Sequence, residues 1–120
     1  MIEPAVCDIS GLTVRYGRRE VLSDLDLQVG RGEAVAVVGP SGSGKSTLLA
    51  SILGMARPHS GTVVVDGQNV TRLPRRELAT LRATRIGMVY QTGELLDELT
   101  ALENVALPLV LAGRDTAEAE

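Results

Sequence analysis

The sequence predicts an α/β fold in which an antiparallel β-subdomain accompanies a core of buried strands and helices. The segments 12–16 and 25–29 alternate apolar and polar residues, as half-buried strands do. By contrast, the runs AVAVV at 34–38 and IGMVY at 86–90 are apolar almost throughout, which is typical of parallel strands buried on both faces. Apolar residues at helical spacing follow the first of these runs. Buried strands and helices therefore alternate along the chain, as they do in α/β folds.

The first elements are expected to be an antiparallel pair of strands. Leu12, Val14 and Tyr16 fall on one face of the first strand, and the polar turn GRRE separates it from the second. The turn GRGE at 30–33 leads into the buried strand 34–38. The apolar face of the helix that follows consists of Leu48, Leu49, Ile52 and Leu53. Gly54 is expected to cap the C-terminus of this helix.

The later elements are predicted from turn and capping patterns. The strand TVVV at 62–65 and the turn DG at 66–67 form a second hairpin element. A helix is expected to begin at Pro74, with Leu78 and Leu81 on one face, and the segment 92–99 is interpreted as a loop. Thr100 and the glutamate three residues later form a capping box that begins a helix, which Pro108 bends or ends. A further helix is expected to begin within RDTAEAE at 114–120.

Composition and charge exclude several classes of protein. The 120 residues carry a net charge of −3 without an evident basic face, so nucleic acid is not expected as a main partner. The single cysteine, Cys7, permits no intramolecular disulfide and is interpreted as a reduced, partly buried thiol of a cytosolic protein. No secretory signal is evident, and no apolar run approaches the ~20 residues that a membrane-spanning helix needs. Neither export nor membrane insertion is therefore expected.

The segment GPSGSGKS at 39–46 matches G-x-x-x-x-G-K-[ST], the Walker A motif of the P-loop NTPase core. Glycines such as Gly42 and Gly44 adopt backbone angles at which successive N–H groups converge on phosphate oxygens. Lys45 would reach the β- and γ-phosphates of ATP, and the Ser46 hydroxyl would bind Mg²⁺. The residues expected to bind the nucleotide are Gly39, Pro40, Ser41, Gly42, Ser43, Gly44, Lys45, Ser46 and Thr47. A buried strand before the motif and a helix after it provide the context that this motif requires.

A P-loop does not by itself specify a reaction, because kinases, GTPases and transport ATPases share it. The flanking segments are VRYG before the loop and IGMVYQ and LTALENVALPLVLAG after it. With these flanks the chain resembles the nucleotide-binding domain of ATP-binding cassette (ABC) transporters over essentially its whole length. The stretch LTALENVALPL looks most like the ATPases of lipoprotein-releasing and macrolide-export systems. The alternative enzyme class is a small-molecule P-loop kinase, but the sequence offers no long arginine-bearing lid.

The resemblance implies roles for residues outside the loop. Tyr16 would be the aromatic residue that stacks on adenine, although a core residue at a strand end is the alternative interpretation. Gln91 would be the Q-loop glutamine, a catalytic residue whose amide oxygen reaches Mg²⁺ and the attacking water. Residues 92–99 would face a membrane-spanning permease subunit, and a second ATP-binding subunit would complete a dimer. The resemblance thus implies a cytoplasmic protein held at the inner face of the membrane by its permease.

Several parts of that family's machinery do not occur in these 120 residues. VVVD at 63–66 imitates a Walker B strand, but the following Gly67 indicates a hairpin turn rather than a catalytic acid. No LSGGQ-like signature is found, and the only histidine, His59, is interpreted as an exposed turn residue. The resemblance places the signature, Walker B and switch histidine after the region covered here. Residues 1–120 are therefore interpreted as the N-terminal part of an incomplete ABC-type domain.

A third, non-enzymatic interpretation follows from these missing parts. The 120-residue chain would bind nucleotide or a membrane partner and hydrolyse nothing, while the longer protein would be the transport ATPase. Apolar strands without their neighbours would expose faces and edges, so we expect marginal stability or self-association.

Overall fold

The computed structural model describes residues 3–93 and 95–119, so Met1, Ile2, Glu94 and Glu120 lie outside the described residues. The chain divides into two compact units, residues 1–74 and 75–120, each of which is considered by itself. The phosphate loop belongs to the first unit, and the segment that contains Gln91 belongs to the second. The expectation that the 120 residues form one part of a larger domain stays a prediction.

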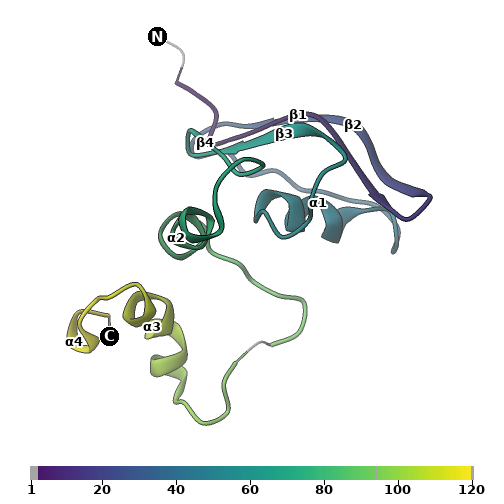
Figure 1. Cartoon of the computed structure of the whole chain (residues 1–120). Helices are drawn as coiled ribbons and strands as arrows, with labels where there is room; N and C mark the ends of the chain where they lie inside the picture. Colours follow the sequence, from purple (N-terminus) through teal and green to yellow (C-terminus); the bar gives the residue numbers. More distant parts are fainter. Residues whose placement is uncertain (1–2, 94, 120) are drawn as a thin grey trace. The chain divides into compact units, whose positions relative to one another are not determined.

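The first unit is built on a four-stranded antiparallel sheet, shown in Figure 1. The strands are β1 (Cys7–Tyr16), β2 (Arg19–Val29), β3 (Ser60–Val65) and β4 (Gln68–Asn69), in the order β2-β1-β3-β4. The predicted hairpin of the first two strands is confirmed, because Leu12 lies opposite Leu25 and Ile9 opposite Leu27. β1 begins earlier than the alternation of its residues indicated. The central position of β1 places both of its edges in hydrogen-bonded pairing.

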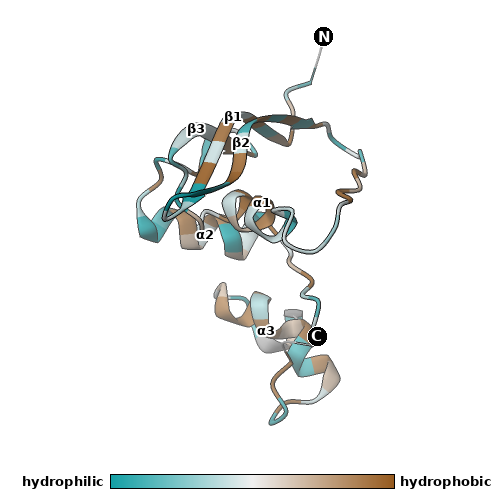
Figure 2. Ribbon diagram, turned by 90° about the vertical axis from the view of Figure 1, so that its right-hand side faces the viewer, coloured by the Kyte–Doolittle hydropathy of each residue, from teal (hydrophilic) through white to brown (hydrophobic). Residues whose placement is uncertain are grey.

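The core of this unit lies between the sheet and the helix α1 (Lys45–Ile52), which packs against β2 and β3. Figure 2 shows the apolar residues, in brown, along the strands above this helix. The most deeply buried side chains are Ile9, Leu12, Val14 and Val63. The predicted glycine cap is present, since Gly54 has a φ of 71° directly after Leu53. The large side chains of the core are thus aliphatic, in keeping with the scarcity of aromatic residues.

The second hairpin confirms that VVVD does not end in a catalytic acid. Asp66 and Gly67 have φ values of 47° and 78°, which are the left-handed angles of a tight turn between β3 and β4. The Asp66 carboxylate accepts a hydrogen bond from Arg31 at 3.3 Å. His59 is exposed, as expected, and its backbone N–H donates to the Thr13 carbonyl at 2.7 Å.

Two expected strands do not form, and the predictions for 34–38 and 86–90 are wrong in that respect. Neither segment pairs with another strand among the described residues, and both leave valines in solvent. Val38 is 87% exposed and Val89 is 94% exposed. A strand that is apolar on both faces forms only when neighbours pair with its edges and cover its faces. The described residues supply no such neighbours, so the two segments remain without strand structure.

The second unit is helical, with α2 (Arg75–Arg85), α3 (Ala101–Leu111) and α4 (Thr116–Ala119). The predicted capping box is present, because the Thr100 hydroxyl accepts from the Glu103 N–H at 3.1 Å and the Glu103 carboxylate accepts from the Thr100 N–H at 2.9 Å. Pro108 was expected to bend or end the helix, and the second alternative is wrong, since α3 runs through Pro108 to Leu111. A proline leaves one carbonyl of the preceding turn without its helical donor, and the rest of the helix continues beyond it. Leu78 and Leu81 are buried, as expected.

Candidate functional site

The phosphate loop joins the segment 34–38 to α1 through two glycines in left-handed conformations. Gly42 has a φ of 82°, and Gly44, the N-cap residue of α1, has a φ of 104°. Such angles are strained for residues with a side chain, so these positions require glycine. Ser43 N–H donates to the Pro40 carbonyl at 3.1 Å, which closes a turn within the loop. No side chain caps the N-terminus of α1, so its first N–H groups are left for another acceptor.

Lys45 is the first residue of α1, and its ammonium group turns back over the loop. It donates to the carbonyl of Gly39 and, at 2.9 Å, to the carbonyl of Pro40. The positive charge therefore lies beside the loop and at the positive end of the helix dipole. Both features favour an anion at this place, as the motif predicts. A phosphate would compete with two neutral carbonyl acceptors for the same ammonium protons.

Ser46 and Thr47 occupy the first turn of α1, where the motif places the metal-binding hydroxyl. Ser46 is exposed, and within residues 3–93 and 95–119 its hydroxyl makes no hydrogen bond. Within the same residues, no three His, Cys, Asp or Glu side chains gather closely enough to hold a metal ion. These features fit a Mg²⁺ ion whose ligands come mainly from nucleotide phosphates, with a single hydroxyl from the protein.

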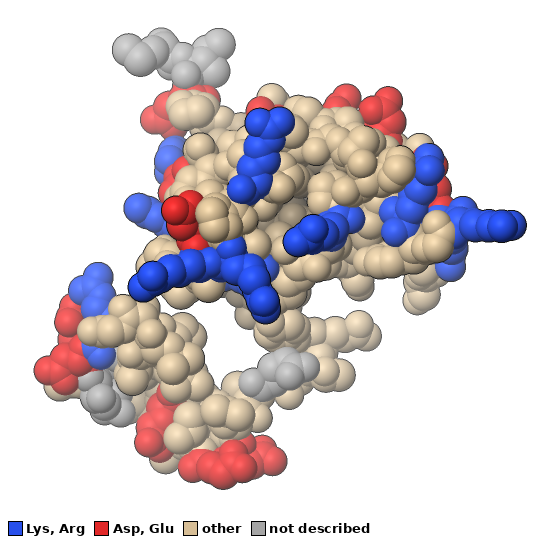
Figure 3. Space-filling model, in the orientation of Figure 1, with Lys and Arg blue, Asp and Glu red and all other residues tan. Residues whose placement is uncertain are grey.

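Residues at the start of β2 contact the phosphate loop. A Cβ atom added to Gly44 would lie 3.0 Å from the Leu22 side chain and 3.1 Å from the Val21 carbonyl oxygen. In addition, the Arg19 guanidinium donates to the Gly42 carbonyl at 3.3 Å. Arg19 was not singled out from the sequence, where it reads as one of two arginines in a polar turn. In Figure 3, blue Lys and Arg side chains lie at the right-hand end of the first unit, where Figure 1 places the turn between β1 and β2.

Tyr16 lies at the end of β1, directly opposite Arg19 across a two-residue turn. Residues directly opposite in an antiparallel pair project from the same face of the sheet, so Tyr16 shares the face from which Arg19 reaches the loop. Tyr16 is 56% exposed, while Val14, two residues earlier, is almost fully buried. The alternative interpretation of Tyr16 as a core residue is therefore wrong. An exposed aromatic ring suits stacking on a flat ligand.

Gln91 lies in the second unit, whereas the phosphate loop lies in the first. It is exposed and follows the segment 86–90, which is not a strand. Within the first unit, Tyr16 is linked to residues 39–47 only through Arg19, which lies opposite Tyr16 and contacts Gly42. The loop expected at 92–99 is confirmed for its described residues, whereas Glu94 lies outside them.

Asn104 organises the end of this loop, and sequence analysis did not single it out. Its side-chain amide accepts from the Leu96 N–H at 2.8 Å and donates to the carbonyls of Leu96, Leu99 and Thr100. One side chain thus satisfies several backbone groups of residues 96–100 at the N-terminus of α3. The capping box next to it was the only available signal that this helix start is tightly specified.

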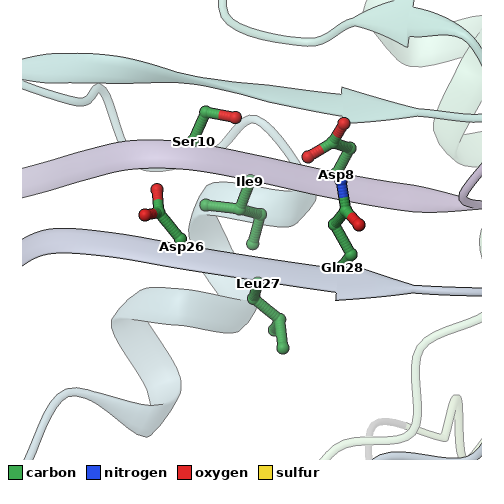
Figure 4. A pocket seen from close by; sticks show the side chains of 6 residues that line it. All are labelled: Asp8, Ile9, Ser10, Asp26, Leu27 and Gln28. Carbon is green, nitrogen blue, oxygen red and sulfur yellow. The ribbon is translucent and has the colours of Figure 1, made fainter.

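A hollow on β1 and β2 is lined by residues outside the phosphate loop. It is lined by Asp8, Ile9, Ser10, Asp26, Leu27 and Gln28. Figure 4 shows the polar side chains on one side of the two strands and the aliphatic ones on the other. The Asp26 carboxylate already accepts a hydrogen bond from the Gly11 N–H at 2.7 Å, which assigns it a structural role.

Burial and, to a smaller extent, the charge of Asp8 raise the pKa of the Cys7 thiol. Cys7 is free and buried, which agrees with the expected partly buried thiol.

The fold and the loop define a nucleotide-binding domain, and comparison with known families identifies its class. Residues 22–120 match the ABC transporter family, and the chain therefore belongs to that family. This membership decides against the small-molecule kinase. Within the described residues, no helix is both long and apolar enough to cross a membrane.

Among curated proteins, the chain is similar to ATP-binding proteins of lipoprotein-releasing systems, named LolD. It is 44% identical to LolD of Bacteroides thetaiotaomicron over 92% of this chain and 51% of that protein. It is 53% identical to LolD of Bordetella pertussis over 86% of this chain and 46% of that protein. The chain thus spans about half the length of these relatives.

Two solved structures of the bacterial ABC transporter cassette MJ0796 are also similar. A dimeric structure matches with a TM-score of 0.81 and 38% identity, over 91% of this chain and 49% of the other. A dimeric post-hydrolysis structure bound to ADP and Pi matches with a TM-score of 0.79 and 37% identity. These matches confirm the fold class predicted from sequence, an α/β fold with an antiparallel β-subdomain.

Proposed function

We propose that this chain is the ATP-binding part of an ABC transporter subunit and that it binds MgATP through residues 39–47. The observation that carries the proposal is the Lys45 ammonium beside the loop, at the uncapped N-terminus of α1. The triphosphate would replace the carbonyls as its acceptor, because charge-assisted hydrogen bonds are the stronger ones. The ADP and Pi held by one MJ0796 structure support the choice of nucleotide. Mg²⁺ would neutralise the phosphates, with Ser46 as its protein ligand.

Tyr16 and Gln91 take the two remaining roles in this proposal. The exposed ring of Tyr16 would stack on the adenine, since it lies on the face from which Arg19 reaches the loop. Gln91 would bring its amide oxygen to Mg²⁺ and to the water that attacks the γ-phosphate. The family membership and the position of Gln91 after IGMVY support that second role.

Two partner proteins are part of this proposal. Residues 92–99 would contact a membrane-spanning permease subunit, and Asn104 would hold the end of that segment in shape. A second ATP-binding subunit would complete the dimer, as the dimeric MJ0796 structures support. The names of the LolD relatives support lipoprotein release as the process served, at the cytoplasmic face of the inner membrane.

A second candidate function concerns the 120 residues as a polypeptide on their own, which would bind ATP without hydrolysing it. The observation that favours it is the position of Asp66, which occupies a hairpin turn and contacts Arg31. Asp66 is therefore engaged elsewhere than at a Mg²⁺ site. The one adjacent acidic pair in the sequence, Asp97-Glu98, follows only two apolar residues and lies in the loop at 92–99 rather than at the end of a strand.

Titration of the purified 120-residue chain with a fluorescent ATP analogue in the presence of Mg²⁺ tests both candidates. We expect saturable binding that unlabelled ATP competes away and that Lys45→Ala abolishes. Binding that Lys45→Ala leaves unchanged would refute the P-loop assignment. Phosphate release is measured in the same samples, and steady turnover that the lysine variant removes would refute the second candidate.

A further inference from the structure

We propose that Arg19 is a positioning residue that shapes the phosphate loop before nucleotide arrives. It does so by holding the Gly42 carbonyl from the hairpin that carries Tyr16. This inference rests on the proposed function and adds a residue that the Walker A motif does not contain.

The contact joins the tip of the β1–β2 hairpin to the loop. The Arg19 guanidinium donates to the Gly42 carbonyl oxygen at 3.3 Å, across 23 residues of sequence. Gly42 is one of the two loop positions with a left-handed φ, so the contact holds the loop at a point where the chain changes direction.

A second set of contacts shows that the loop rests on the same part of β2. Gly44 lies so close to Val21 and Leu22 that an added Cβ would come within 3.1 Å of the Val21 carbonyl. Arg19 and these two residues together contact both left-handed glycines of the loop. The start of β2 therefore supports the loop at Gly42 and Gly44, and Arg19 provides the polar contact.

The role follows from which atom Arg19 contacts. In an anion-binding loop the N–H groups converge on the phosphates, so a donor bound to a carbonyl acts on the backbone rather than on the ligand. Its effect is to restrict the loop before binding, which lowers the ordering cost that the ligand would otherwise meet. Arg19 therefore raises the affinity of the loop for any triphosphate, whatever base the triphosphate carries. Tyr16, by contrast, would act only on a ligand with an aromatic base.

The neighbouring Arg18 provides a matched control. It carries the same charge one residue earlier, is exposed, and makes no hydrogen bond within the described part of the chain. Arg18→Ala therefore removes an equal long-range attraction without removing a contact. Arg19→Lys retains the charge and one donor, while Arg19→Gln retains a donor without the charge.

The test measures the affinity of the 120-residue chain for two probes, MgATP and magnesium tripolyphosphate, in these variants. We expect Arg19→Ala to weaken both probes by about fivefold to tenfold, as loss of one charge-assisted hydrogen bond does. Arg18→Ala should change either affinity less than about twofold, since exposed charges act weakly. Arg19→Lys should recover most of the loss, and the unfolding temperature should not change.

Hydrogen exchange of the nucleotide-free chain gives an independent readout. Arg19→Ala should raise the exchange rates of residues 41–44, and Arg18→Ala should not. Equal affinities and equal exchange in the Arg19→Ala and Arg18→Ala variants would overturn this inference while leaving the proposed function intact. Failure of the unmodified chain to bind MgATP would overturn the proposed function and this inference together.

Discussion

Tyr16 lies directly opposite Arg19 across the β1–β2 hairpin, and the Arg19 guanidinium contacts the phosphate loop at Gly42. The position proposed for the adenine base and the loop proposed for the phosphates are therefore connected through a single pair of facing residues. Each site residue of the first unit can be tested separately, because in the proposed function different side chains would contact the base and the phosphates.

The ring of Tyr16 should contribute to binding of the base and not of the phosphates. We expect Tyr16→Ala to weaken MgATP binding by about threefold to tenfold, because an aromatic stack is worth about 0.5–1.5 kcal/mol. Tyr16→Phe keeps the ring and should bind nearly as well as the unmodified chain. Affinity for magnesium tripolyphosphate, measured by calorimetry, should be the same in all three proteins. An equal loss for both ligands in Tyr16→Ala would argue that the ring supports the loop instead.

Gly44 should tolerate no side chain. Its φ of 104° is strained for alanine, and the new Cβ would press on Val21 and Leu22 at 3.0–3.3 Å. We expect Gly44→Ala to lower the free energy of unfolding by about 1–3 kcal/mol, as an enforced unfavourable backbone conformation does. Gly87→Ala is the control, since a Cβ there meets nothing within 4 Å. Denaturant unfolding compares the two, and equal stabilities would show that the loop relaxes around the new methyl group.

The apolar segments 34–38 and 86–90 should cause the isolated chain to associate. Val38 and Val89 are almost wholly exposed, and neither segment has a pairing partner among the described residues. Apolar segments whose backbone N–H and C=O groups lack a pairing strand favour strand pairing between molecules. Sedimentation velocity should show oligomers that decrease in Val38→Glu and Val89→Glu. Gln68→Glu adds the same charge at an exposed polar position and should leave the distribution unchanged. A monomeric, cooperatively unfolding chain would contradict this expectation.

The capping box makes the start of α3 sensitive to acid. Hydrogen bonds from the backbone and then the side chain of Thr100 lower the pKa of Glu103 below its ordinary value. Because the pKa is lowered in the folded state, this stabilisation is present above the ordinary value and is lost as pH falls through the folded value. Exchange protection of the first turn of α3 should therefore decrease in moderate acid. Glu103→Gln keeps an acceptor without titrating, so the acid dependence of that turn should be weaker in this variant.

Local patterns predicted the elements that depend on local interactions. The β1–β2 hairpin, the Asp66 turn, the Gly54 cap and the capping box at Thr100 all formed where alternation and turn residues placed them. The apolar runs 34–38 and 86–90 failed as strands because a buried strand depends on partners that its own sequence does not encode.

The candidate site also combines features that local sequence predicts with features that only the fold creates. The motif predicted the loop, because glycine positions and a lysine are local features. Arg19 and Asn104 could not be predicted, since each acts through backbone atoms that only the fold brings near. An arginine in a turn and an asparagine in a helix have no sequence pattern that distinguishes them from ordinary surface residues.

The central claim is that Lys45 leaves its loop carbonyls to bind the triphosphate, and one property of the sequence permits a direct test. Lys45 is the only lysine, so an amine-acetylating reagent can modify only its ammonium group and the N-terminal amine. Mass spectrometry then measures Lys45 acetylation relative to the N-terminus, with and without MgATP. We predict that MgATP and magnesium tripolyphosphate both protect Lys45, whereas adenosine does not. Equal acetylation of Lys45 at saturating MgATP would contradict the claim.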